Sequence, residues 1–417
     1  MRGLPIVPLV LLYGCAGGDK PVDSAATTTS WYADVKPIVD GRCAGCHVAG
    51  GIAPFPLDSY AAASAMSTAM ASAVSGGRMP PWPPDAECND YLSDRSLSAE
   101  QIATIVLWAD EGAPEGEAAD EGAALTPIEG MSRVDLTLTM SEPYTPLLEP
   151  DDYRCFLLEW TGGDAFVTGF SATPGNRSIV HHVIAYRVPA DEVAGYEAMD
   201  AAEDGAGYTC FGGPGGSEGG GAAWLGGWVP GSTGADFPAG TGIAMEEGAL
   251  IAMQIHYNTG TVGPQADQTA IQMKLDDNVD KQAAIVKVFD PRWLVPGGMT
   301  IAAGDADASH AFTYTNSSAQ TFSLWSSGLH MHQLGSSASL TLDQAAGQDD
   351  CLVEISNWRF GWQGTYFFQE PVEFAPGDSA TLTCNWDNSG AGAVDTEWGE
   401  GSTDEMCLAM VYTTMAD

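Results

Sequence analysis

The fold of the C-terminal third is indicated by the stretch Gly328-Leu-His330-Met-His332-Gln-Leu-Gly335. Residues 322–325 before it and 337–342 after it are predicted to form strands. Residues two apart on a strand point to the same face, so His330 and His332 can offer two imidazoles to one ion. Imidazole pairs suit copper or zinc. The alternative is that the two histidines only share a polar sheet face.

Composition favours a multidomain, mainly β protein. At 417 residues, the chain is long enough for two or three domains. Its 45% hydrophobic content supports globular packing, and 50 Gly with 25 Pro favour β-sandwiches with many turns. The net charge of −40 argues against direct binding to nucleic acid or to an anionic membrane surface.

The N-terminus has the pattern of an export signal. Met1-Arg2 precedes an apolar run over 4–12, which is too short to span a bilayer. Cys15 directly after Gly14 resembles a bacterial lipoprotein box, in which the cysteine receives lipid; the alternative is an ordinary signal peptide. We therefore predict a signal over 1–15, a flexible linker over 16–30 and an exported protein. Its lipid would anchor it to a bacterial membrane, facing the periplasm or the cell exterior.

Cys43-Ala-Gly-Cys46-His47 has the sequence that attaches c-type haem. Two thioethers would fix the macrocycle, and the adjacent histidine would take one axial position on the iron. A zinc knuckle would need a second ligand pair nearby in the sequence, and a redox Cys-x-x-Cys does not require the histidine. Haem is therefore the favoured interpretation.

The second axial ligand is predicted to be Met79, which lies in a stiff Pro-rich loop. Met66 and Met70 are rivals, but their Ala/Ser-rich surroundings predict a helix, where methionine usually packs in a core. A capped helix is predicted over 98–109. Residues 31–118 together resemble a small class I-like cytochrome c, followed by a linker over 119–128.

Later histidines and one methionine lie in a β-rich region. Adjacent residues on a regular strand face opposite ways, so His181 and His182 can share an ion only at a strand end or a distortion. His256 ends an apolar strand and makes a three-imidazole site plausible. Met406 stands beside two carboxylates and Cys407, an unusual place for simple core packing.

These sites, in this order, resemble the copper type II ascorbate-dependent monooxygenases, the family of peptidylglycine α-hydroxylating and dopamine β-monooxygenases. The resemblance covers about residues 129–417. It implies two antiparallel, jelly-roll-like β-sandwich domains at 129–278 and 279–417, with a cleft between them. It implies two copper ions, one held by His181, His182 and His256 and the other by His330, His332 and Met406.

The resemblance also implies disulfides. Six cysteines are available, and their spacing alone leaves the pairing open: Cys88, Cys155, Cys210, Cys351, Cys384 and Cys407. By resemblance, Cys155 pairs with Cys210 and Cys384 pairs with Cys407. The pairing of Cys88 and Cys351 stays open.

The implied activity is hydroxylation of a C–H bond with O2. His330, His332 and Met406 would form the catalytic site, since a soft thioether stabilises Cu(I), while the other copper would store an electron. The implied partners are a small-molecule or peptide-like substrate and an electron donor, either an ascorbate-like reductant or a redox protein. Two alternatives remain: a non-catalytic haem/copper electron-transfer or copper-binding lipoprotein, and a copper-free ligand-binding sandwich fused to cytochrome c.

Several positions depart from the family pattern. Gly328 stands where peptide-hydroxylating members have an arginine that holds the substrate carboxylate, so a C-terminal peptide substrate is disfavoured. Gln333 replaces a further histidine, and the Gly-rich residues 212–221 predict a surface loop. The fused cytochrome has no counterpart in the animal enzymes. We expect its haem to supply electrons to the copper sites.

Overall fold

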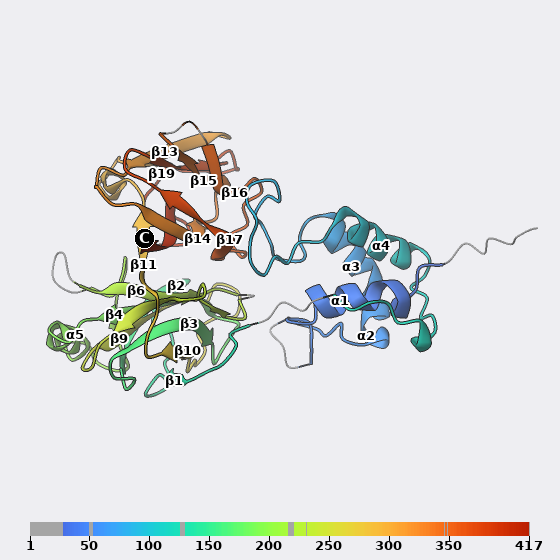
Figure 1. Ribbon diagram of the computed structural model, residues 1–417, viewed down its shortest axis with the longest axis horizontal. Helices are drawn as coiled ribbons and strands as arrows, with labels where there is room; N and C mark the ends of the chain where they lie inside the picture. Colours follow the sequence, from blue (N-terminus) through green and yellow to red (C-terminus); the bar gives the residue numbers. More distant parts are fainter. Residues whose placement is uncertain are drawn as a thin grey trace, which may run out of the picture.

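The computed structural model describes residues 28–49, 53–125, 130–215, 221–230, 232–345, 347 and 349–416. The predicted signal peptide, Cys15, most of the following linker and part of the Gly-rich insertion lie outside the described residues. The described chain consists of a helical part followed by two β-sandwiches, which confirms the predicted mainly β fold class (Figure 1). No helix among the described residues is long and apolar enough to cross a membrane.

The helical part packs around a small aromatic core. Its helices are η1 (Trp31–Val35), α1 (Lys36–Arg42), α2 (Tyr60–Ala65), α3 (Ser67–Ser75), α4 (Ala99–Asp110) and η2 (Ala118–Asp120). Trp31 and Trp108 are fully buried and lie with ring centroids 5.9 Å apart. The predicted cap of α4 is present, because Ser98 and Gln101 exchange side-chain and backbone hydrogen bonds in a capping box.

The first sandwich has two facing antiparallel sheets. One contains β1 (Leu136–Thr139), β10 (Ala270–Asp276), β3 (Ala165–Thr173), β8 (Thr241–Met245) and β7 (Ala235–Asp236). The other runs β5 (Tyr208–Thr209), β2 (Asp151–Glu159), β9 (Leu250–Asn258), β4 (Val180–Val188) and β6 (Ala223–Trp228). Central strand β9 is buried along almost its whole length, and most of its residues are apolar, with Gln254 and His256 as buried polar exceptions. Helix α5 (Val193–Asp200) packs outside this second sheet.

The second sandwich is built in the same way. Its inner sheet has β11 (Lys281–Val288), β20 (Leu408–Met415), β14 (Phe322–His330) and β17 (Tyr366–Phe374). The outer sheet runs β13 (Ala308–Thr315), β18 (Ser379–Trp386), β15 (Gly335–Asp343) and β16 (Asp349–Ile355). Short elements η3 (Pro291–Leu294), β12 (Thr300–Ile301) and β19 (Thr396–Glu397) complete it.

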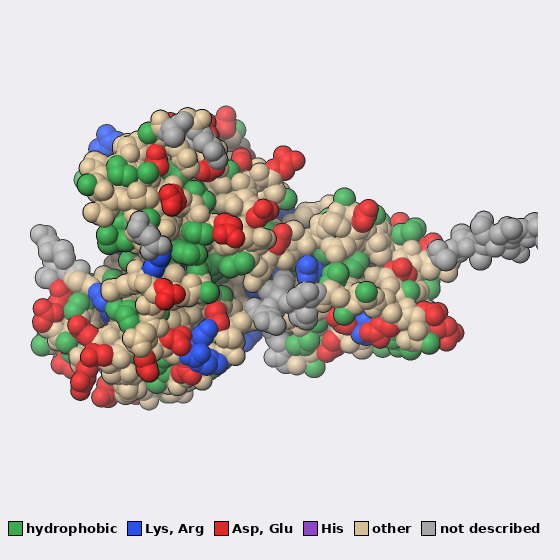
Figure 2. All heavy atoms as spheres, viewed as in Figure 1, with side chains coloured by type: hydrophobic (Ala, Val, Ile, Leu, Met, Phe, Trp, Pro, Cys, Tyr) green, Lys and Arg blue, Asp and Glu red, His purple; other side chains and the backbone are tan. Residues whose placement is uncertain are grey.

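The two sandwiches are joined by hydrogen bonds, because the sheet of the first sandwich that contains β8 is continuous with the inner sheet of the second. Strand β11 pairs with β20 and also, over two residue pairs, runs parallel to β8 of the first sandwich. The Tyr412 hydroxyl lies 2.9 Å from Thr241 Oγ1 across the same junction. Hydrophobic side chains gather where the two lobes meet, whereas acidic side chains are spread over both lobes (Figure 2).

Three disulfides stabilise this arrangement. Cys155–Cys210 and Cys384–Cys407 are the two pairs that the resemblance implied, one in each sandwich. Cys88–Cys351, which the sequence left open, joins the region between α3 and α4 to β16. Cross-linking residues so far apart limits the freedom of the unfolded chain.

Residues 80–95, here called the connecting segment, leave the helical part and lie along the second sandwich (Figure 1). The backbone N–H of Leu92 donates to the carbonyl of Phe367, and that of Gln369 donates to the carbonyl of Asp90. The Tyr91 hydroxyl donates to the carbonyl of Leu352. The region predicted as one unit over 31–118 therefore has a middle portion that packs on another domain.

Candidate metal centres

His330 and His332 lie at the end of β14, not both on it. The strand ends at His330, and His332 stands in the connection to β15, so the predicted same-face strand geometry does not describe this pair. The chain bends instead and brings the rings together. Their Nε2 atoms are 3.2 Å apart.

The outer nitrogens of both rings are held by hydrogen-bond acceptors. His330 Nδ1 lies 2.6 Å from Gln363 Oε1, and His332 Nδ1 lies 3.1 Å from the carbonyl of Asp404. Gln363 is itself oriented, because its Nε2 donates to the carbonyl of Phe360. Each Nδ1 must therefore carry the proton, which leaves a lone pair on each Nε2. Two lone pairs facing each other at this distance fit a cation between them.

Burial keeps these imidazoles neutral. It lowers the pKa of His330 to about 3 and the pKa of His332 to about 4. A hydrogen bond to Gln363 and one to the Asp404 backbone oppose the shift at His330 and His332 respectively. Neutral imidazole is the form that binds metals.

Met406 follows a carboxylate that anchors the loop carrying His332. Glu405 is fully buried and accepts from the backbone N–H of His332 (2.8 Å) and from that of Leu334 (2.6 Å). Trp386 Nε1 also donates to it at 2.8 Å. Burial raises the pKa of Glu405 to about 7, although these hydrogen bonds oppose the shift. Met406, 6% exposed, lines the same cavity as His330; its role as a ligand stays a prediction.

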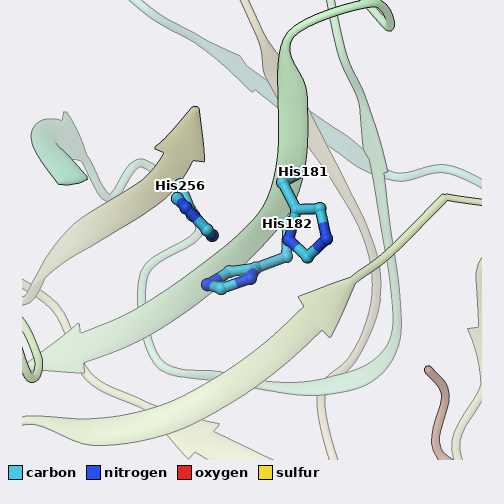
Figure 3. A group of neighbouring side chains, drawn as sticks. All are labelled: His181, His182 and His256. Carbon is cyan, nitrogen blue, oxygen red and sulfur yellow. The ribbon is translucent and has the colours of Figure 1, made fainter. Parts of the chain in front are cut away.

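The other histidine set belongs to the first sandwich. His181 and His182 lie at the start of β4, and His256 lies near the end of neighbouring β9 (Figure 3). The pairing of β4 with β9 shifts register between Val180 and His182, which supplies the distortion that two adjacent ligands require. One ring nitrogen from each histidine lies within 4.8 Å of the others.

His256 is oriented by a carboxylate. Its Nε2 donates to Asp151 Oδ1 at 2.9 Å, which leaves a lone pair on Nδ1. Asp151 also accepts from Ser402 Oγ (2.8 Å) and Asn258 Nδ2 (2.9 Å). Burial alone would raise the pKa of Asp151, but hydrogen bonds from His256 and Ser402 hold that pKa below its ordinary value.

Two nitrogens of this set are buried without a hydrogen-bond partner, namely Nδ1 of His181 and Nδ1 of His256. Leaving such atoms unpaired is costly, so the arrangement fits a bound metal that accepts their lone pairs. Burial lowers the pKa of His181 to about 3 and holds the pKa values of His182 and His256 below the ordinary value. All three rings are therefore neutral.

The two sets face each other across the junction of the sandwiches. The rings of His182 and His330 have centroids 6.2 Å apart. The Phe360 ring stacks on His181 at 4.4 Å and lies 5.9 Å from His332. The remaining histidine, His310, lies on β13 of the outer sheet with its Nε2 3.0 Å from the carbonyl of Thr300, and it belongs to neither set.

Gly328 has a steric reason to be glycine. A Cβ at this position would lie 2.7 Å from the carbonyl oxygen of Gly364. The backbone of residue 364 thus occupies the space that a side chain at position 328 would need. An arginine cannot be accommodated there without moving that loop.

Sequence reasoning missed several residues that orient the histidines: Asp151, Gln363, Phe360, Asp404 and Glu405. Asp404 and Glu405 adjoin Met406, so their position was a usable signal. Nothing in the sequence around Asp151 or Gln363 indicates that they reach His256 and His330.

The haem motif lies in the turn after α1. Cys43 and Cys46 are free thiols, and burial raises the pKa of Cys43 to about 12, opposite to the lowered pKa of a redox-active thiol. His47 Nδ1 donates to the carbonyl of Phe55 at 2.9 Å, which leaves Nε2 for an iron. These residues fit a c-type haem. Met79 follows α3 and is partly buried against the helical core; its role as second axial ligand stays a prediction.

The fold and sites together define a two-sandwich β protein with at least partly buried, neutral imidazole clusters that fit metal ions. Residues 293–415 match the family model described as copper type II ascorbate-dependent monooxygenase, C-terminal domain. The matched range contains His330, His332 and Met406. The match supports this family, with copper as the expected metal and monooxygenation as the expected reaction class. Such a family implies a substrate, O2 and a reductant such as ascorbate.

Other comparisons add no argument. None of the curated proteins matches the chain. Among solved structures, PNGF-II in the P21 space group is 11% identical with a TM-score of 0.28, over 67% of this chain and 65% of that chain. The major capsid protein P2 of bacteriophage PM2 is 9% identical with a TM-score of 0.26, over 68% and 98%. Likenesses this weak carry no inference about function. The chain spans slightly less than two thirds of the PNGF-II chain.

Proposed function

We propose that this protein is an exported copper-dependent monooxygenase that hydroxylates a C–H bond of an organic substrate with O2. The observation that carries the proposal is the pair of Nε2 lone pairs of His330 and His332, 3.2 Å apart with both Nδ1 atoms engaged elsewhere. At the catalytic site, the copper ligands would be His330, His332 and Met406. His181, His182 and His256 hold the second copper.

The chain's own residues prepare the site for this chemistry. Copper bound by imidazoles and a soft thioether cycles between two oxidation states and supports reduction of O2. Gln363 and Asp404 fix the ring orientations of His330 and His332, and Glu405 holds the loop between them and Met406. Burial keeps the imidazoles of His330 and His332 neutral, with Nε2 unprotonated, so these ligands need no proton loss before they bind metal.

Export and haem belong to the same proposal. Three disulfides suit an oxidising compartment, which supports export, and the sequence of residues 1–15 adds a lipid anchor at Cys15. Free Cys43 and Cys46 beside an oriented His47 support covalent haem c. A haem held by Cys43, Cys46 and His47 would supply the copper sites with electrons from an external donor.

Metal analysis and oxygen uptake test the central claim. The purified mature protein should contain about two copper ions and about one haem per chain. Oxygen uptake should require both copper and an organic substrate. A protein that holds both metals yet consumes no oxygen with any C–H substrate would be an electron carrier instead. If the purified protein contained no copper, both the monooxygenase and the haem/copper electron carrier would be excluded.

Stopped-flow reduction tests the role of the haem. A Cys43→Ala/Cys46→Ala variant should lose covalent haem, and a redox-protein donor should then reduce its copper more slowly. Ascorbate should still reduce the copper, which serves as the matched control. Unchanged copper reduction by the protein donor would contradict electron supply through the haem.

A further inference from the structure

The cavity between the two sandwiches has a third wall that comes from the N-terminal part of the chain. The cavity has a volume of about 850 Å³, and His182, His330 and Met406 line it. The connecting segment lines it as well, through Pro81, Trp82, Leu92, Ser93 and Arg95. Four of the candidate copper ligands, His181, His182, His330 and Met406, therefore line the same cavity as this segment.

Contacts to both sandwiches hold the connecting segment in place. On the second sandwich, the Trp82 ring meets the Tyr366 ring edge-on at 5.3 Å, and Cys88 is bonded to Cys351. On the first sandwich, Arg95 Nη2 donates to Thr233 Oγ1 at 3.3 Å. The segment thus bridges the two lobes and closes one side of the cavity between them.

The lining of the cavity is aromatic and has no net formal charge. Of its 50 lining residues, 14 are Phe, Trp or Tyr, whereas aromatic residues make up 9% of the whole chain. Its charged residues are two cationic and two anionic: Arg95, Lys287, Asp236 and Glu400. The whole chain, in contrast, has a net charge of −40. Such a lining favours an apolar, uncharged molecule over an acid or an amine.

The volume of the cavity further restricts the class of ligand that it fits. Small-molecule sites occupy roughly 300–1,000 Å³, so this cavity is at the large end of that range. A single aromatic ring would leave most of the aromatic walls without contact. A polycyclic molecule would contact several walls at once, including the wall formed by Trp82.

We propose that this cavity is a substrate chamber for neutral polycyclic or polyaromatic molecules, and that Trp82 is one of its specificity-determining residues. The name substrate chamber rests on the proposed function, because it takes the adjacent histidines and Met406 as the reacting centre. The part of the chain that carries the haem motif thereby also shapes what reaches the copper ligands.

Equilibrium dialysis of the full-length holoprotein, without reductant so that no turnover occurs, tests the chamber. The probes are 1-pyrenemethanol, the anionic 1-pyrenebutyrate with the same ring system, and benzyl alcohol with a single ring. We expect 1-pyrenemethanol to bind at one site per chain, at least about tenfold more tightly than either comparison compound.

Variants then locate the binding. Trp82→Ala should weaken 1-pyrenemethanol binding about tenfold, because a buried aromatic contact is lost, and Trp82→Phe should recover most of it. The matched control is Tyr314→Ala, which removes a half-exposed aromatic side chain on β13 that does not line the cavity. It should bind the probe like the unaltered protein.

Two results would overturn the chamber. One is unaltered 1-pyrenemethanol binding by a Trp82→Ala protein that retains the Cys88–Cys351 bond. If that variant does not fold, Leu92→Ala replaces it, with binding expected to weaken about threefold. The other is benzyl alcohol or 1-pyrenebutyrate binding as tightly as 1-pyrenemethanol.

Failure of the proposed function has a different signature. If 1-pyrenemethanol binds as expected but no neutral polycyclic compound supports oxygen uptake, the cavity is a ligand site and the oxygenase is rejected. If oxygen uptake is found, Trp82→Ala should raise KM for polycyclic substrates while kcat changes little. An unchanged KM would reject the role of Trp82 and leave the oxygenase standing.

Discussion

The two histidine sets are both neutral and at least partly buried, but the groups that orient them differ. In the first sandwich, His256 is held through Nε2 by the carboxylate of Asp151, and Nδ1 is left to bind metal. In the second, His330 and His332 are held through Nδ1 by an amide and a backbone carbonyl, and Nε2 is left free. A carboxylate makes the imidazole it binds a stronger donor than neutral acceptors do. If both sets hold copper, we expect the copper of the second set to be the more easily reduced, which would suit the catalytic role proposed for it.

The largest effect should come from removing one ligand of either set. His332→Ala should reduce the copper content from about two ions per chain to about one and abolish oxygen uptake, because a two-ligand site does not retain copper. His182→Ala should give the same stoichiometry with the other copper remaining. Metal analysis with electron paramagnetic resonance distinguishes the two. If either variant lost both ions, the two sets would be a single centre.

Changing the orienting groups should give a smaller effect. Asp151→Ala should weaken copper binding at the first set roughly 10- to 100-fold, since outer partners of ligating histidines contribute about that much. Gln363→Ala should act only on the second set, and less strongly, because the lost partner is uncharged. Competitive chelator titration measures both affinities. If both variants lost the same copper affinity, the carboxylate of Asp151 would not strengthen its histidine more than the amide of Gln363 does.

Glu405 holds the loop that carries His332, so replacing it tests how much this loop contributes to the second set. Glu405→Ala leaves two backbone N–H groups and the Trp386 indole N–H without their acceptor. The free energy of unfolding should fall by about 1–3 kcal/mol, with a few-fold loss of copper affinity at His330 and His332. Urea denaturation of the metal-free protein measures the first quantity. Glu370→Ala, at an exposed position, is the control and should leave both unchanged.

Removing the Cys88–Cys351 disulfide should have the smallest effect on the two histidine sets. Cys88→Ser/Cys351→Ser should lower the free energy of unfolding by about 2–4 kcal/mol while copper affinities stay within about twofold, because the bond lies outside both histidine sets. Thermal unfolding and chelator titration check the two parts. A large loss of copper would mean that the connecting segment also positions ligands.

Much of this arrangement was predictable from local sequence. The strands around His330 and the capped helix that begins after Ser98 follow from short-range patterns, and the structure contains them. The distortion at His181 and His182 was only a condition for shared binding, which the structure meets. The mainly β fold class was predicted from composition and alternation. These features are set by residues near one another in the chain, which is why sequence reasoning reaches them.

The remainder depends on contacts between distant segments. His332 lies beyond the strand predicted to carry it, because Glu405 and Asp404, more than 70 residues away, bend the connection. The partnership of Asp151 with His256 spans 105 residues, and Cys88–Cys351 spans 263. No periodicity or spacing in the chain indicates such pairs, so only the folded structure reveals them.

The Cys88–Cys351 bond makes residues 88–351, in covalent terms, a closed ring that contains the first sandwich and the second sandwich only as far as β16. A single proteolytic cut anywhere within this ring would leave the pieces joined, so they would separate on a gel only after reduction. The residues of the haem motif stay attached to the second sandwich after such a cut, because the backbone between them and Cys88 is intact. Any electron passed between them would travel within one molecule, at a rate that dilution does not change.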